Sequence, residues 1–182
     1  MSDWMKMLNK MEGAVDRDYD YYAEGNFIRT NSPSMNYIFS KCPGLSFGEF
    51  MLLWGPPKAG KSIITNAFIA GLHAQDPNAI AVKFDTEMRS TGREEPFWGI
   101  DDDRFQAFNA NEPELIFDCI KDEFLPMLQK GFPMRLLIID SLRGVAGVKA
   151  SNAKSVTDHQ MGDKAMTIQK GLEAIMPVLR RS

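Results

Sequence analysis

The stretch GPPKAGKS at positions 55–62 has the residue types and spacing of a phosphate-binding loop. It matches G-x-x-x-x-G-K-[ST], in which glycines let the backbone turn so that successive N–H groups surround a phosphate. Lys61 is expected to reach the β- and γ-phosphates of a nucleotide, and the Ser62 hydroxyl to ligate Mg²⁺. The alternative is a chance strand–turn–helix sequence. The expected nucleotide contacts of this loop are Gly55, Pro56, Pro57, Lys58, Ala59, Gly60, Lys61, Ser62 and Ile63.

Two carboxylates follow apolar stretches further along the chain. Asp140 ends the run LLIID, where a second metal-side residue is expected to hold Mg²⁺ through water. Glu87 follows the run AIAVKF, and the carboxyl ends of parallel strands are where such sheets bind ligands. We expect Glu87 to be the general base that activates water, with Lys61 as the other catalytic residue. The alternative for Glu87 is a solvated loop residue.

Strand and helix patterns alternate around these residues. The strand patterns are short apolar runs of the kind found in buried parallel sheets, and the helix patterns repeat apolar residues every three to four positions. This alternation predicts an α/β fold with a mainly parallel sheet. The predicted strands are 27–30, 50–54, 79–84, 105–109 and 135–139, and the predicted helices are 3–15, 61–75, 112–129 and 162–181.

The predicted helices carry recognisable stripes and end signals. Asn111 and Glu114 resemble a capping box at the start of the helix 112–129, and Pro126 is expected to kink or end that helix. The expected stripes are Trp4, Leu8, Met11 and Val15 in the first helix, Ile64, Phe68 and Leu72 in the second, Leu115, Ile116, Cys119 and Ile120 in the third, and Met166, Leu172, Ile175 and Leu179 in the last.

Composition and charge narrow the class of protein. A chain of 182 residues that is 44% hydrophobic and 25% charged forms roughly one globular domain, which excludes a collagen, a disulfide scaffold and a disordered chain. Cys42 and Cys119 have no partners at metal-ligand spacing. The chain shows no apolar signal core and no membrane-length apolar run, so we expect a cytoplasmic protein.

The net charge of −3 is distributed unevenly along the chain. Residues 1–140 carry a net charge of −7, whereas residues 141–182 carry seven basic and three acidic side chains, a net charge of +4. This asymmetry favours an anionic partner for the C-terminal third. The alternative is a solvated helix face.

The order of these motifs resembles that of the RecA-type recombinase family, and most of all its phage UvsX-type branch. The similarity runs from about residue 26 to residue 180 and includes IRTNSPSMNYIFS, FDTE, WGIDDDRF and LLIIDSL. It implies a RecA-like P-loop core, a DNA-dependent ATPase that uses ATP and Mg²⁺, and a nucleotide contact from Ser141 beside Asp140. If the chain is phage-encoded, its compartment is the host cytoplasm. One departure is that no aromatic residue follows Glu87 closely to pack on adenine, so Thr91 or Arg93 is left for that contact.

The resemblance also implies a single-stranded DNA contact after Asp140. Segments 149–154 and 158–162 are similar to the mobile DNA-contacting loop of these recombinases and the turn that follows it. Lysines there would pair with phosphates, and a methionine would wedge against bases. The alternative is a polar connector. The expected DNA-binding residues are Lys149, Ser151, Asn152, Lys154, Met161 and Gly162.

The resemblance divides the chain into residues 1–34, an N-terminal helix and strand, and residues 35–182, an ATPase core. The first segment would join subunits into a helical filament, or else pack on its own domain. In RecA-type sheets a further strand lies between the strand that precedes the phosphate loop and the strand that ends in the Walker-type aspartate, here Asp140. We expect this further strand to be missing here. The runs 50–54 and 135–139 would then face a gap.

These expectations lead to three interpretations of function. The first is a recombinase that coats single-stranded DNA and promotes homologous pairing and strand exchange in recombination and repair, here as a truncated or split form. We expect it to lack robust ATPase activity without a complementing C-terminal fragment. The second is a RecA-fold hexameric DNA helicase motor. The third is a non-catalytic fragment that assembles with a partner subunit.

Overall fold

The computed structural model describes residues 7, 10, 25–40, 44–89, 96–110, 112–142, 168–173 and 175. Its centre is a three-stranded parallel sheet in the order β4 (Phe105–Asn109), β3 (Ile80–Asp85), β5 (Met134–Asp140). The register places Asp85 opposite Asp140, so the two strands end together at their carboxyl ends. The prediction of an α/β fold with a parallel sheet is confirmed, and β4 has the predicted bounds.

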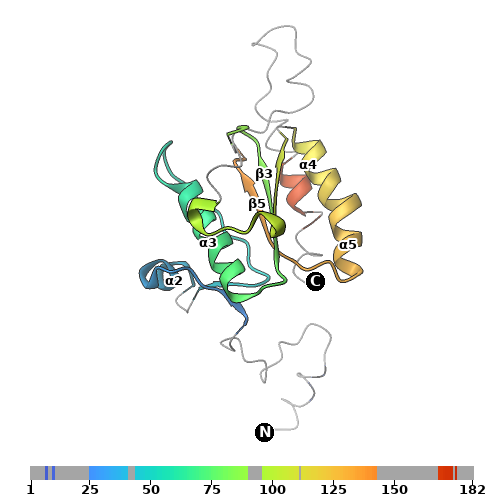
Figure 1. The fold of residues 1–182 in the computed structure, drawn as a ribbon. Helices are drawn as coiled ribbons and strands as arrows, with labels where there is room; N and C mark the ends of the chain where they lie inside the picture. The colour runs from blue at the N-terminus through green and yellow to red at the C-terminus, as the bar shows by residue number, and fades with distance from the viewer. Residues whose placement is uncertain are drawn as a thin grey trace.

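Helices cover both faces of this sheet (Figure 1). Helix α3 (Lys61–Gln75) lies on one face, and the stretch formed by α4 (Pro113–Cys119), η3 (Ile120–Phe124) and α5 (Leu125–Gln129) lies on the other. Two short 3₁₀ turns, η1 (Pro96–Trp98) and η2 (Asp102–Arg104), precede β4. The predicted helix 61–75 is confirmed, and its residues Phe68 and Leu72 are fully buried.

The two faces of β3 pack into two separate apolar clusters. Val82 and Phe84 point to the α4–α5 side, where Ile116, Ile120 and Ile175 are also buried. Ala81 points to the α3 side and packs with Phe68, Leu72 and Ile138. The alternation follows from the two-residue period of a strand, which sends neighbouring side chains to opposite faces. The sheet is therefore held between helices, as its continuous apolar strands predicted.

The helix that begins at Pro113 does not end at Pro126. Its middle section, η3, is π-helical, and the N–H group of Leu125 donates to the carbonyl of Ile120 five residues back. This wider turn immediately precedes Pro126, which has no N–H group and would crowd the carbonyl four residues earlier in a regular α-helix. Of the two expected effects of Pro126, a helix end is wrong, because α5 continues to Gln129, the predicted end of the helix, whereas a kink remains a prediction.

Two details of the start of this helix differ from the prediction or lie beyond the description. Glu112 is the N-cap residue and makes no side-chain cap hydrogen bond. Asn111, the other half of the expected capping box, lies outside the described residues. Leu115 was expected in the buried stripe but is 56% exposed, because it lies beside the stripe of Ile116 and Ile120 rather than within it.

The predicted strand 50–54 is not a strand in the structure. The segment belongs to neither of the sheets formed by the described residues. Leu52 and Trp54 are 77% and 92% exposed, while Met51 packs against the α3-side cluster. Exposure therefore alternates along this segment, which has one side on the protein and lies outside both sheets of the described residues. The predicted strand pairing of the apolar run is not found there.

The N-terminal part of the description is a small antiparallel pair and a short helix. Strand β1 (Phe27–Ile28) pairs with β2 (Leu45–Ser46), and α2 (Pro33–Ser40) lies between them. Ile28 is 2% exposed and packs with the α3-side cluster, so β1 lies on its own domain. The division at residue 34 and the oligomerisation role of residues 1–34 remain predictions.

Helix α2 was not predicted from the sequence. The Ser32 hydroxyl accepts a hydrogen bond from the N–H of Met35 at 3.4 Å, and Pro33 occupies the first turn of the helix. Serine as N-cap followed by proline is a helix-start signal. That signal was available in the sequence, and the short length of the helix hid it.

Several predicted elements lie largely outside the described residues. These are the helix 3–15, of which only Met7 and Lys10 are described, and most of the helix 162–181, which is helical at 168–173 and 175. Leu172 is partly buried and Ile175 is buried, as predicted, whereas Met166 and Leu179 lie outside the description. In the part of the chain that is described, no helix has the length and apolarity needed to cross a bilayer.

Candidate functional site at the start of α3 and the end of β5

The loop 55–60 leads directly into α3, as its spacing predicted. Gly60 is the N-cap residue with φ +88°, a left-handed conformation that glycine adopts without a steric penalty. No side chain caps the helix start, so its first N–H groups have no side-chain acceptor. Such N–H groups, together with the helix dipole, favour an anion at this end. Local geometry is therefore suited to a phosphate.

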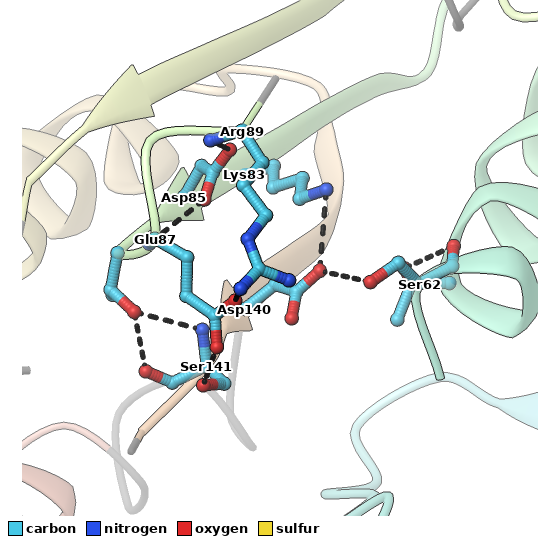
Figure 2. Close-up of polar contacts among 9 residues, drawn as sticks. Ser62, Lys83, Asp85, Glu87, Arg89, Asp140 and Ser141 are labelled. Atoms are coloured by element: carbon cyan, nitrogen blue, oxygen red, sulfur yellow. Dashed lines mark hydrogen bonds and ion pairs between the residues drawn. The ribbon is translucent and has the colours of Figure 1, made fainter. Parts of the chain in front are cut away.

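Ser62 and Asp140 meet although 78 positions separate them. The Ser62 hydroxyl donates to Asp140 Oδ2 at 2.8 Å (Figure 2). Ser62 comes from the first turn of α3, and Asp140 is the last residue of β5. A hydroxyl and a carboxylate oxygen are ligands that suit Mg²⁺. These are the two residues predicted as the metal side of the site, so the donor set fits that ion.

Lys61 folds over the loop that precedes it. Its Nζ donates to the carbonyl oxygens of Gly55 at 3.1 Å and Pro56 at 3.0 Å. The ammonium group therefore lies at the mouth of the loop, on the side where the N–H groups at the start of α3 begin. Neutral carbonyls do not compensate the positive charge of the Lys61 ammonium, so this group can still pair with an anion.

The Glu87 carboxylate lies on a turn that follows β3. Asp85 shapes this turn, because its carboxylate accepts hydrogen bonds from the N–H groups of Glu87 at 3.0 Å and Arg89 at 2.8 Å. Glu87 Oε2 pairs with the Arg89 guanidinium at 2.8 Å, and Ser141 Oγ lies 3.4 Å from Glu87 Oε1. Glu87 thus stands beside the end of β5, next to Asp140 (Figure 2).

A second bridge ties the ends of β3 and β5 together. The Thr86 hydroxyl donates to the carbonyl of Ser141 at 2.6 Å and accepts from the N–H of Ser141 at 2.9 Å. The N–H of Thr86 also donates to the carbonyl of Asp140 at 2.9 Å. These bonds fix the two carboxyl ends relative to each other, which holds Glu87 and Asp140 on one edge of the sheet.

Four contributors to this site were not predicted from the sequence. Asp85 and Thr86 directly precede Glu87 and hold its turn and the end of β5 by hydrogen bonds. Arg89 pairs with Glu87, and Lys83 forms an ion pair with Asp140 at 3.4 Å. Charged and hydroxyl residues clustered in KFDTEMR were a visible signal. A lysine inside an otherwise apolar strand was the clearest of these signals, since a buried ammonium requires an anionic partner.

Not all predicted site residues are brought together. The side chains of Pro56, Pro57, Lys58 and Ala59 are exposed on the loop, and Ile63 is 54% exposed. The adenine candidates Thr91 and Arg93 lie outside the described residues. So do all the predicted DNA contacts, which are Lys149, Ser151, Asn152, Lys154, Met161 and Gly162.

The described residues contain no group of three or more histidine, cysteine, aspartate or glutamate side chains that is placed to hold a metal ion. The groups described at this edge are the hydroxyls of Ser62, Thr86 and Ser141, together with carboxylates and ammonium or guanidinium groups. A scan of the sequence against protein-family models found no match, and a search among curated proteins found no significantly similar sequence.

Proposed function

We propose that this protein binds ATP with Mg²⁺ at the start of α3 and hydrolyses it in a DNA-dependent manner. The observation that carries the proposal is the 2.8 Å contact between Ser62 Oγ and Asp140 Oδ2. A chance match to a loop pattern has no reason to bring its serine against the strand-ending aspartate from 78 positions away. The same two residues were expected from the sequence to share one metal ion.

Each residue of the site has a distinct part in this proposal. The N–H groups at the start of α3 bind phosphate oxygens, and Lys61 leaves the Gly55 carbonyl to pair with the β- and γ-phosphates. Ser62 and Asp140 hold Mg²⁺, which neutralises charge on the phosphates when bound. Glu87 accepts a proton from the attacking water. The hydrogen bonds of Thr86 keep the carboxylates of Asp140 and Glu87 on one edge of the sheet.

The finer part of the proposal is a RecA-like core acting as a recombinase that forms a filament on single-stranded DNA. Its support is the resemblance of the motifs in the order loop, FDTE, LLIIDSL, together with the basic C-terminal third. The parallel order β4–β3–β5, with both carboxylates at one edge, is compatible with such a core. ATP held between subunits would favour the DNA-gripping state, and hydrolysis would release it.

The test is equilibrium binding of a fluorescent ATP analogue in the presence of Mg²⁺. Lys61→Ala is expected to weaken binding by at least about tenfold, because a charge-assisted contact to phosphate is lost. Lys130→Met removes an exposed lysine at the end of α5 and should leave binding unchanged. Equal affinity of Lys61→Ala and the native chain would refute nucleotide binding at this loop.

Turnover separates the catalytic part of the proposal from binding. Glu87→Gln should keep the affinity for ATP and lower single-turnover hydrolysis by about 100-fold or more. Single-stranded DNA should raise turnover of the native chain. Turnover that is indifferent to DNA would remove the recombinase part and leave the nucleotide site.

A second candidate is a nucleotide-binding protein that does not turn ATP over by itself. It is favoured by the segment 50–54, which precedes the loop without pairing into the sheet and leaves Trp54 92% exposed. A loop entered from a segment outside the sheet is less rigidly held than one that follows a sheet strand. Tight ATP binding without hydrolysis, with or without DNA, would favour this candidate, whereas vigorous turnover by the purified chain would exclude it.

A further inference from the structure

Lys83 is a buried ammonium group in the middle of an apolar strand. It lies in β3 between Val82 and Phe84, and its side chain is 8% exposed. Val82 and Phe84 point to the α4–α5 cluster, so Lys83 points to the opposite face, toward α3. Burying an ammonium is costly unless a counter-charge compensates it. The strand therefore carries this charge for a reason that packing does not supply.

The counter-charge of Lys83 is the metal-side carboxylate of the proposed site. Lys83 Nζ lies 3.4 Å from Asp140 Oδ2, and the same oxygen accepts the hydrogen bond from the Ser62 hydroxyl at 2.8 Å. Figure 2 shows the Lys83 ammonium and the Ser62 hydroxyl converging on the same carboxylate of Asp140. One carboxylate oxygen thus receives an ammonium from β3 and a hydroxyl from α3. The Lys83 ammonium is thus a fixed positive charge beside the carboxylate that would bind a divalent cation.

We propose that Lys83 is a resident cation of this site, which lowers the affinity of the Ser62–Asp140 pair for a divalent cation and offsets the repulsion between Asp140 and a triphosphate. The inference deepens the proposed function and rests on it for the triphosphate. An ammonium beside a carboxylate cancels most of the field that attracts a second cation. The same ammonium leaves less net negative charge facing an incoming anion. Lys83 is therefore a positioning residue that sets how strongly the site depends on metal.

The two consequences have opposite signs, and this makes them testable. In Lys83→Met, the affinity for Mn²⁺ in the absence of nucleotide should rise at least tenfold, measured from the loss of the free Mn²⁺ signal in electron paramagnetic resonance. In the same variant, the affinity for a fluorescent ATP analogue in excess chelator should fall at least tenfold. A purely structural defect would lower both affinities, because a distorted edge would bind neither probe better.

Controls isolate the position and the charge. Lys130→Met removes an exposed lysine far from this edge and should change neither affinity. Asp140→Asn combined with Lys83→Met should abolish the gain in Mn²⁺ affinity. If circular dichroism shows that Lys83→Met does not fold, Lys83→Gln takes its place, since it keeps a polar end without the charge.

The outcomes distinguish this inference from the proposed function. An Mn²⁺ affinity that is unchanged, lowered or undetectable in the folded Lys83 variant would overturn the role of Lys83, whatever the nucleotide data. A raised Mn²⁺ affinity in a chain that binds no ATP analogue even with Mg²⁺ would refute the proposed function and retain Lys83 as the cation beside Asp140. Both affinities moving as expected would support both proposals.

Discussion

The two ends of α3 differ in whether a side chain caps their backbone groups. At the C-terminal end, the Arg104 guanidinium donates to the carbonyl oxygens of Asp76 at 2.8 Å and His73 at 3.3 Å, and its Nε pairs with Asp101 at 2.8 Å. At the N-terminal end, Gly60 provides no side-chain cap. One end is closed by a cation from another part of the chain, whereas the other presents its N–H groups.

This difference separates stability from ligand binding within one helix. A helix leaves four carbonyls and four N–H groups without intrahelical partners, and each set needs partners from elsewhere. Arg104 supplies partners for the carbonyls and favours the negative end of the dipole. The N–H groups at the start of the helix are suited to the proposed anion site. Substitutions at the C-terminal end should therefore change folding, and those at the N-terminal end should change ligand affinity.

The largest expected effect is that of Arg104→Met on stability. Its guanidinium is mostly buried and bonds to the carbonyls of His73 and Asp76 and to the carboxylate of Asp101. Losing hydrogen bonds to a charged group should lower the free energy of unfolding by about 1.5–3 kcal/mol. Denaturant titration measures this loss. The affinity for an ATP analogue should stay unchanged, because the proposed nucleotide site lies at the other end of α3.

Arg104→Lys sharpens this prediction, because it keeps the charge and loses the planar fork that reaches several acceptors. We expect Lys at this position to recover only part of the lost stability. Full recovery would mean that charge near the helix end, and not the hydrogen bonds, stabilises α3. A large drop in nucleotide affinity in either variant would break the separation between the two ends.

Ser62→Ala should show the reverse pattern at the N-terminal end. Removing the hydroxyl deletes the 2.8 Å bond to Asp140 and one ligand of the proposed Mg²⁺ site. We expect the Mg²⁺-dependent affinity for an ATP analogue to fall about tenfold, which corresponds to about 1.4 kcal/mol. The free energy of unfolding should change less, by about 0.5–1 kcal/mol, since the pair is exposed to solvent.

Thr65→Val is the matched control for Ser62→Ala. Thr65 lies one turn further along α3, and its hydroxyl donates to the carbonyl of Ser62 at 2.9 Å. The substitution removes a hydroxyl from the next turn of the same helix without touching Asp140. Should both variants lose affinity equally, the effect would come from the helix start in general and not from the metal-side hydroxyl.

Gly60→Ala should have a smaller effect that reports on the loop backbone. A Cβ at this position meets no atom within 4 Å, so the substitution adds only the strain of φ +88°. A left-handed non-glycine residue costs about 1 kcal/mol. Gly131→Ala is the matched control, since Gly131 has φ +89° and equally open surroundings beyond α5. Both variants should lose similar stability by thermal unfolding, and only Gly60→Ala should also lose nucleotide affinity.

The fold was predictable where a short-range pattern determines it. The pattern located α3 to the residue, because this helix has an apolar face that must be buried, and β4 also has the predicted bounds. The run 50–54 was misassigned since an apolar run reports a preference for burial and says nothing about whether a partner strand lies beside it. The helix does not end at Pro126, because a π-turn upstream accommodates the proline, and no local residue preference predicts such a turn.

The site was predictable where residue type restricts the chemistry. The loop spacing and the strand-ending Asp140 identified two groups that the structure places 2.8 Å apart. Lys83 was missed since its partner is set by the register of β3 against β5, which the sequence does not state. The Arg104 cap was missed for the same reason, because it joins η2 to the end of α3 across about thirty residues.

The smallest expected effect is a pH dependence from His73, which lies under the same Arg104 cap. Burial, and then the nearby Arg104 charge, lower the pKa of His73, while Asp101 acts against them. The Nδ1 atom of His73 accepts a hydrogen bond from the N–H of Asp101 at 3.1 Å, which requires the neutral ring. In the unfolded chain this histidine titrates near pH 6.5.

The sign of the effect follows from the lowered folded-state pKa. Below about pH 6.5 the unfolded chain binds a proton that the folded chain refuses, so stability is full above that pH and falls as the pH drops toward the folded value. His73→Asn keeps an acceptor oxygen near the Nδ1 position and cannot titrate. The stability of the native chain relative to this variant should therefore decrease between pH 7.5 and pH 5.5, as urea titrations at several pH values would show. His159→Asn, which replaces the other histidine of the sequence, should retain the native slope. If His73→Asn shows the same pH slope as the native chain, the acid sensitivity arises outside the Arg104 cap. The C-terminal end of α3 would then differ from the N-terminal end in hydrogen bonding alone.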